Sequence, residues 1–267
     1  MNMMRRTMKA MAISRRELVL CDLRRRIRDL EAGQRKPGAG VLPFGLGSLD
    51  EAMPEGGLAL GALHEVAAGA QGLAHEAAAM LFVAGIVARL DGSVLWALRT
   101  PDLFAPGLAG IGLHPDRVIY AEAGTETGDR TVLLVMEEGL RHGGLAAVVG
   151  EISRLSLTAS RRLQLAAEKS GTLALALRRH VDREPVGRNQ PNAAGSCWRI
   201  AALPSAPLPV PGLGRPRWQV ELLRCRGGQP ASWELESCDA QGRLAVPSIL
   251  ADRSATAQPG RWRAAAA

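Results

Sequence analysis

Short apolar runs alternate with helical stretches between about residues 42 and 179. The runs are almost continuously apolar, which is typical of parallel strands that helices cover on both faces. We therefore expect an α/β fold with a mostly parallel sheet, in which ligands bind beyond the carboxyl ends of the strands. The expected strands are 58–68, 93–99, 117–123, 145–152 and 172–179, and the expected helices are about 73–90, 102–111, 127–142 and 158–170.

The later apolar runs have a different pattern. In 217–226, apolar and polar residues alternate from Trp218 and Gln219 onward, as in a strand with one exposed face. Similar runs occur at 198–203 and 232–238. The turn-forming residues 226–230 lie between the runs 217–226 and 232–238. We therefore expect an antiparallel extension of the sheet.

The chain divides into three parts by composition. Residues 1–40 are a basic segment with a linker at its end, and 41–251 form the α/β domain. Residues 252–267 have the composition of a flexible C-terminal tail. Within the domain, the polar segment 180–197 is rich in Gly, Asn and Pro, which predicts a surface loop.

Residues 14–32 predict an amphipathic helix. Ser14 and Glu17 have the spacing of a capping box, and arginines flank an apolar stripe. Two interpretations are open: the helix packs on its own domain with a solvated basic face, or it docks on a partner or on phosphate. The candidate partner-binding residues are the members of the stripe, Leu20, Leu23, Ile27 and Leu30.

The net charge of +7 comes from the N-terminal segment. Residues 1–36 hold 11 Lys and Arg against 4 Asp and Glu, and the remaining 231 residues hold 22 of each sign. The charge of the whole chain is therefore poor evidence for a nucleic-acid-binding core. Aromatic residues make up only 3% of the chain, so few rings are present to stack on bases.

Cysteine and histidine spacing argues against a metal site. No C-x-x-C pair occurs, and the five His are scattered without the spacing of zinc ligands. The basic N-terminus lacks the apolar segment of a signal peptide, and no apolar run is long enough to span a membrane. We therefore expect a cytoplasmic protein without a metal and with free thiols at its four cysteines, Cys21, Cys197, Cys225 and Cys238.

The segment 69–76 has the outline of a phosphate-binding loop and lacks its chemistry. An apolar run enters a Gly-bearing turn, and an Ala-rich helix follows. A working loop reads G-x-x-x-x-G-K-[ST], in which the Lys reaches the phosphates and the hydroxyl holds Mg²⁺. With Gly69 as the first glycine, the last three positions hold Ala74, His75 and Glu76, and Gly72 lies within the turn. We expect no nucleotide, no other cofactor and no catalytic residue.

The order of these parts resembles the RecA-like recombinase family. Residues 45–50 and 56–61 are similar to the segment before the family's phosphate loop, and 145–151 lies where the family has its Mg²⁺-associated acidic strand. Two departures accompany the resemblance, in addition to those in the segment 69–76. Leu98 occupies the place of a glutamate that orients the attacking water, and Gly150, followed by Glu151, occupies the place of the acidic residue. The resemblance implies a RecA-like domain in which phosphoryl transfer has been lost.

A degenerate domain of this kind, with the sequence LQLAAE at 163–168, resembles the ImuA family of bacterial damage-inducible mutagenesis cassettes. The resemblance implies an accessory protein in error-prone translesion synthesis. Its partners would be an ImuB-type, Y-family-like protein and an error-prone polymerase subunit of the replicative type, with DNA, RecA or a second copy as further candidates. Two alternatives remain, a SulA-type inhibitor of cell division and a RecA-type DNA-dependent ATPase.

Two loops follow the last expected parallel strands, where RecA-like proteins place their DNA-contacting loops. The first spans 153–158, and the second starts at the end of the strand 172–179. A loop with several arginines can hold a phosphate backbone, or it can be a solvated loop, because acidic residues dilute its charge. The candidate DNA-binding residues are Arg154, Arg178, Arg179, Arg183 and Arg188.

Overall fold

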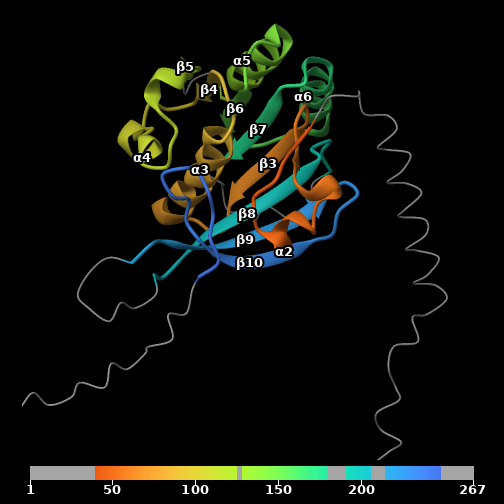
Figure 1. Cartoon of the computed structure of the whole chain (residues 1–267). Helices are drawn as coiled ribbons and strands as arrows, with labels where there is room; N and C mark the ends of the chain where they lie inside the picture. Colours follow the sequence, from red (N-terminus) through yellow and green to blue (C-terminus); the bar gives the residue numbers. More distant parts are fainter. Residues whose placement is uncertain (1–39, 125–127, 180–190, 206–213, 248–267) are drawn as a thin grey trace, which may run out of the picture.

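A computed structural model describes residues 40–124, 128–179, 191–205 and 214–247 (Figure 1). The predicted helix at 14–32 and the predicted tail at 252–267 lie outside these residues. In chain order the elements are β1 (Val41–Leu42), α2 (Gly47–Asp50), the 3₁₀ helix η1 (Pro54–Gly56), β2 (Leu58–Ala59), β3 (Leu63–Ala68), α3 (Leu73–Ala88), β4 (Val94–Leu98), α4 (Ala105–Ala109), the 3₁₀ helix η2 (Pro115–Arg117), β5 (Val118–Glu122), α5 (Asp129–His142), β6 (Ala147–Ile152), α6 (Leu157–Ser170), β7 (Leu173–Arg178), β8 (Ser196–Leu203), β9 (Arg217–Cys225) and β10 (Ala231–Glu236).

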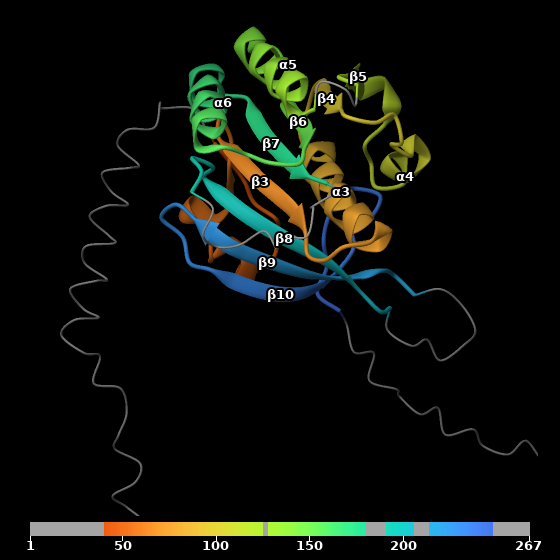
Figure 2. The same ribbon diagram turned by 180° about the vertical axis from the view of Figure 1, so that it is seen from behind.

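The main sheet has eight strands in the order β10-β9-β8-β3-β7-β6-β4-β5. All pairs from β3 to β5 are parallel, and the pairs β8–β9 and β9–β10 are antiparallel. Figures 1 and 2 show the antiparallel strands at the end of the sheet remote from α5 and α6. The prediction of a mostly parallel α/β fold with an antiparallel extension is therefore confirmed.

The extension begins one strand later than expected. Strand β8, which we expect within the antiparallel extension, is antiparallel to β9, with Ile200 opposite Val220, but parallel to β3, with Val66 opposite Trp198. Strands β7 and β8 lie on either side of β3 and run in the same direction, and such a connection needs a crossover of a dozen or more residues, whereas a hairpin needs as few as two. The polar segment between β7 and β8, 179–195, is long enough for such a crossover.

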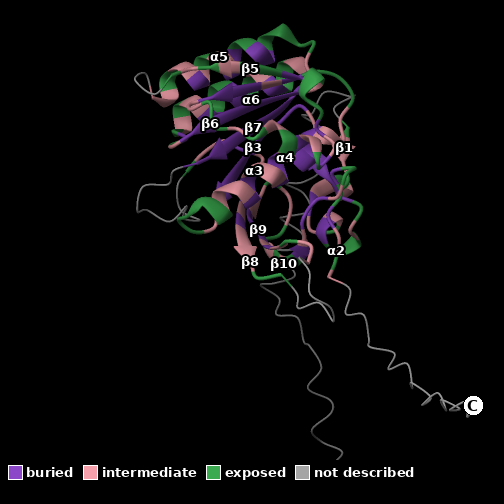
Figure 3. Ribbon diagram, turned by 90° about the vertical axis from the view of Figure 1, so that its left-hand side faces the viewer, coloured by how far each residue is buried: buried purple, intermediate pink, exposed green. Residues whose placement is uncertain are grey.

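Helices cover both faces of the parallel strands, as expected. One apolar core lies between the sheet and α3 with α4, and the other lies between the sheet and α5 with α6. The first core holds a cluster of three rings, Phe44, Phe82 and Trp198, whose centroids are 5.6–5.9 Å apart. Figure 3 shows buried residues along the strands and exposed ones on the outer sides of the helices.

Helix α5 approaches the sheet closely because two glycines face each other's elements. A β-carbon added at Gly139 on α5 would lie 3.2 Å from Cγ2 of Val148. One added at Gly150 on β6 would lie 2.6 Å from Cγ of Met136 and closer still to its Sδ atom. Met136 is fully buried, so it has little room to move away. The absence of a side chain at position 150 thus fixes how near α5 sits to the sheet.

Helix α6 is held in place by its own polar residues. The Ser156 hydroxyl accepts a hydrogen bond from the Ala159 N–H at the start of the helix, and Gly171 ends it with φ +78°. Gln164, within the LQLAAE sequence, accepts the backbone N–H of Leu63 at 2.9 Å. This contact ties α6 to the beginning of β3, the strand that leads into the turn at 69–72.

Candidate functional site

The segment 69–76 has the strand–turn–helix context that a phosphate-binding loop requires. Strand β3 ends at Ala68, and α3 begins at Leu73 after Gly72, whose φ of +117° favours glycine. The turn packs against β8, because the Gly69 N–H donates to the Ile200 carbonyl at 2.6 Å. A β-carbon at Gly69 would lie 2.6 Å from that of Ala201, so position 69 is closed on this side.

The two side chains at the end of this segment both make internal contacts. The Nδ1 atom of His75 accepts the backbone N–H of Ala202 at 3.1 Å, which points the ring at β8. The carboxylate of Glu76 faces Arg179, with 4.0 Å between Oε2 and Nε. His75 therefore binds the neighbouring strand where the motif has a phosphate-binding lysine, and Glu76 puts a carboxylate where it has a hydroxyl.

The guanidinium of Arg179 is surrounded by carboxylates at the carboxyl end of the sheet. Its Nη1 and Nη2 atoms donate to the two oxygens of Asp102, each at 2.8 Å, and Nη1 also donates to Oε2 of Glu151 at 2.9 Å. The Arg179 side chain is only 7% exposed. Burial by itself lowers the pKa of Arg179, but the hydrogen bonds and charges of Asp102 and Glu151 outweigh it and raise the pKa.

Glu151 is the buried member of this group. Its Oε1 atom accepts the indole N–H of Trp96 at 3.1 Å, and its side chain is 2% exposed. Burial raises the pKa of Glu151, and the charge of Arg179 and the Trp96 hydrogen bond offset only part of that rise. Successive residues of a strand point to opposite faces of the sheet, so Gly150 faces α5, whereas Glu151 faces Trp96 and the α3 side.

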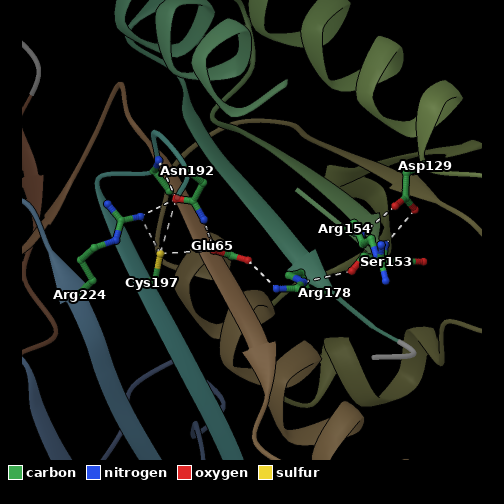
Figure 4. A network of polar contacts seen from close by, with 9 residues as sticks. Glu65, Asp129, Ser153, Arg154, Arg178, Asn192, Cys197 and Arg224 are labelled. Carbon is green, nitrogen blue, oxygen red and sulfur yellow. Dashed lines mark hydrogen bonds and ion pairs between the residues drawn. The ribbon is translucent and has the colours of Figure 1, made fainter. Parts of the chain in front are cut away.

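A second polar network crosses the opposite face of the sheet (Figure 4). Glu65 lies at its centre, 3.2 Å from Nη1 of Arg178, and both side chains are 4% exposed. The same carboxylate accepts the Asn192 amide at 2.5 Å and the Cys197 thiol at 3.3 Å. Arg224 donates to Asn192 and to the sulfur of Cys197. Each buried charge in this network therefore has a partner.

The network continues from Arg178 into the loop after β6. The Nε atom of Arg178 donates to the Ser153 carbonyl at 3.1 Å. The backbone N–H groups of Ser153 and Arg154 donate to the two oxygens of Asp129, each at 2.8 Å, and Asp129 begins α5 (Figure 4). Arg99 contacts Ser153 and lies 3.5 Å from Asp129. The first predicted DNA-contacting loop is therefore fastened to α5 at its base.

The candidate arginines lie in different environments. Arg178 and Arg179 are buried and each is ion-paired, whereas the Arg154 side chain is exposed. Outside the described residues lie Arg183 and Arg188 of the second loop and the whole partner-binding stripe, Leu20, Leu23, Ile27 and Leu30.

Sequence reasoning missed the carboxylates that pair with these arginines. Glu65 and Glu151 are single charges within otherwise apolar runs, a pattern that calls for a buried counter-ion. Asp102 follows the end of β4, where ligand-facing residues of parallel sheets gather. Across the described residues, no group of three or more His, Cys, Asp and Glu side chains is arranged to hold a metal ion, and no helix is long and apolar enough to cross a membrane.

Comparison with known proteins gives two close relatives. No protein-family model matches the chain. It is 42% identical over 245 residues to Protein ImuA of Caulobacter vibrioides strain NA1000 / CB15N, with 87% of this chain and 99% of the relative covered. The same identity and coverage hold for Protein ImuA of Caulobacter vibrioides strain ATCC 19089 / CIP 103742 / CB 15.

Proposed function

The chain belongs to the ImuA family, and from that premise we propose that it is a non-catalytic adaptor in SOS-induced, error-prone translesion DNA synthesis. It docks on an ImuB-type, Y-family-like protein and works together with an error-prone polymerase subunit of the replicative type. Its α/β domain does not turn over nucleotide.

One observation carries the non-catalytic part of this proposal. The side chains of the segment 69–76 contact the protein itself: His75 accepts from β8, and Glu76 faces the buried Arg179. Phosphoryl transfer needs positioned phosphates, a metal ion and a placed nucleophile together. A loop whose key positions are engaged in this way is poorly suited to supply the first two. Magnesium-dependent ATP hydrolysis by the pure protein, with and without DNA, is the direct test, and robust turnover would refute this part.

The docking part assigns the partner contact to the N-terminal segment. The apolar stripe of Leu20, Leu23, Ile27 and Leu30 is long enough to bury four aliphatic side chains. Each buried aliphatic side chain contributes about 1.5–3 kcal/mol before the cost of association. The burial of these four side chains therefore provides enough free energy to hold a regulated complex together.

The double variant Leu23→Asp and Ile27→Asp tests this assignment. We expect it to weaken binding to the ImuB-type protein at least about tenfold while the α/β domain keeps its thermal stability. The matched control is Leu134→Asp with Leu165→Asp, two exposed leucines on α5 and α6. If only the control pair loses partner binding, the docking surface is the α5–α6 face. If the first pair melts the domain instead, the N-terminal helix is structural.

DNA contact is a further part of the proposal and rests on Arg154, Arg183 and Arg188. Arg154 is exposed on a loop that Asp129 holds firmly at its base. Phosphate contacts of this kind give binding that weakens with salt and ignores sequence. Each Arg→Ala change should lower the slope of log affinity against log salt by about 0.7 on single strands. A pull-down from damaged cells with and without nuclease separates direct partner binding from joint occupancy of DNA.

A further inference from the structure

RecA-like proteins bind a divalent cation at the carboxyl ends of the sheet strands, which we call the carboxyl edge. In this protein the carboxyl edge leaves no room for such a cation. The Nη1 atom of Arg179 lies 2.8 Å from Oδ1 of Asp102 and 2.9 Å from Oε2 of Glu151. Calcium–oxygen distances are about 2.3–2.6 Å. A divalent cation between these two oxygens would therefore stand almost where the Nη1 atom is, and the two cannot coexist.

We infer that Arg179 is a built-in cation that takes the place of a divalent metal ion and excludes such an ion from this edge. The inference rests on the non-catalytic part of the proposed function and is independent of the docking part. According to this inference, Arg179 determines whether a divalent cation can bind between Asp102 and Glu151.

Burial and connectivity support this role. Arg179 joins β7, the loop after β4 and β6 through Asp102 and Glu151, as a bridging ion would. Its Nε atom has no hydrogen-bond partner among the described residues, although Glu76 lies 4.0 Å away.

Removing the guanidinium should therefore open a cation site. In Arg179→Ala, Asp102 and Glu151 lose their shared counter-ion, and small shifts of a few tenths of an ångström bring their oxygens to the distances of calcium ligands. We expect Tb³⁺, a luminescent substitute for Ca²⁺, to bind the variant at least about tenfold more tightly than the unaltered protein. Trp96 contacts Glu151 directly, so its excitation should sensitise the Tb³⁺ emission.

Two controls isolate the site. Arg154→Ala removes one exposed positive charge from the same edge, and it should leave Tb³⁺ binding unchanged. Arg179→Ala combined with Glu151→Gln removes a ligand, and it should lose the gained affinity. Equal Tb³⁺ binding by the unaltered protein and Arg179→Ala would overturn the inference, as would a gain of affinity in Arg154→Ala.

The test also covers variants that fold poorly. Arg179→Gln keeps a hydrogen-bonding side chain without the charge, and 10 mM CaCl₂ should raise the melting temperature of either variant but not that of the unaltered protein. If neither variant folds in the presence of Ca²⁺, a metal ion does not replace the guanidinium, and the inference is wrong. ATP hydrolysis by the unaltered protein would refute the proposed function whatever the Tb³⁺ result.

Discussion

Arg179 and Asp102 are joined by two parallel hydrogen bonds, from Nη1 to Oδ1 and from Nη2 to Oδ2, each 2.8 Å long. Arg179 follows β7 and Asp102 follows β4, and β6 lies between these two strands in the sheet. The pair thus spans two strand spacings across the carboxyl edge. Bidentate Arg–carboxylate pairs fix geometry as well as adding energy.

We predict that Asp102→Asn lowers the free energy of unfolding by about 1 kcal/mol, because one charged acceptor is lost. The Asp102 side chain is 43% exposed, so solvent screening keeps the effect small. Urea denaturation measures it. Asp91→Asn, at an exposed turn residue, is the matched control and should change stability by less than about 0.5 kcal/mol. An equal effect of the two substitutions would show that the Asp102 pair contributes nothing.

We predict that Gly150→Ala destabilises the domain by about 1–3 kcal/mol, because the added methyl group meets the buried Met136. Gly47→Ala is the control, since nothing lies within 4 Å of a β-carbon there, and it should be neutral or slightly stabilising. Adding Met136→Ala to Gly150→Ala should cost less than the sum of the single changes. Strict additivity would mean that the two side chains do not meet.

The buried pair of Glu65 and Arg178 should behave as a unit. Arg178→Met leaves a buried carboxylate without its cation, and we expect a loss of about 3–5 kcal/mol. Adding Glu65→Gln should recover most of that loss, since the remaining charge is removed. Arg141 is an exposed arginine on α5, and Glu137, the buried one of its two partners, also pairs with Arg162, so Arg141→Met should cost less than about 1 kcal/mol. A double variant as unstable as Arg178→Met would contradict the coupling.

The thiols should differ sharply in reactivity. Burial, helped by the charge of Glu65, raises the pKa of Cys197 to about 12, and burial with Asp239 raises the pKa of Cys238 to about 12. At pH 8 their reactive thiolates are thus scarce as well as enclosed. In a Cys21→Ser background, we expect iodoacetamide to modify the half-buried Cys225 at least about 100-fold faster than either. Mass spectrometry of labelled peptides measures the rates, and urea should equalise them.

The elements were predictable because their signals are local. Continuous apolar runs gave the parallel strands, and Gly72 marked the turn before α3. The direction of β8 was not predictable, because an apolar run has the same appearance in either direction and only its neighbours, β3 and β9, decide it. The burial of Arg178 and Arg179 was not predictable either. Two arginines before a polar segment are typical of a surface, and their burial depends on carboxylates far away in the chain.

The contacts of the segment 69–76 carry an evolutionary consequence. Glu76→Thr would introduce the hydroxyl of the motif but take one carboxylate away from Arg179. His75→Lys would introduce the cation of the motif but remove the acceptor for the Ala202 N–H. Each single substitution toward the motif therefore removes a contact of the present domain without completing a phosphate-binding loop. Because these contacts interlock, the gain of a phosphate-binding loop at this segment would require several substitutions at once.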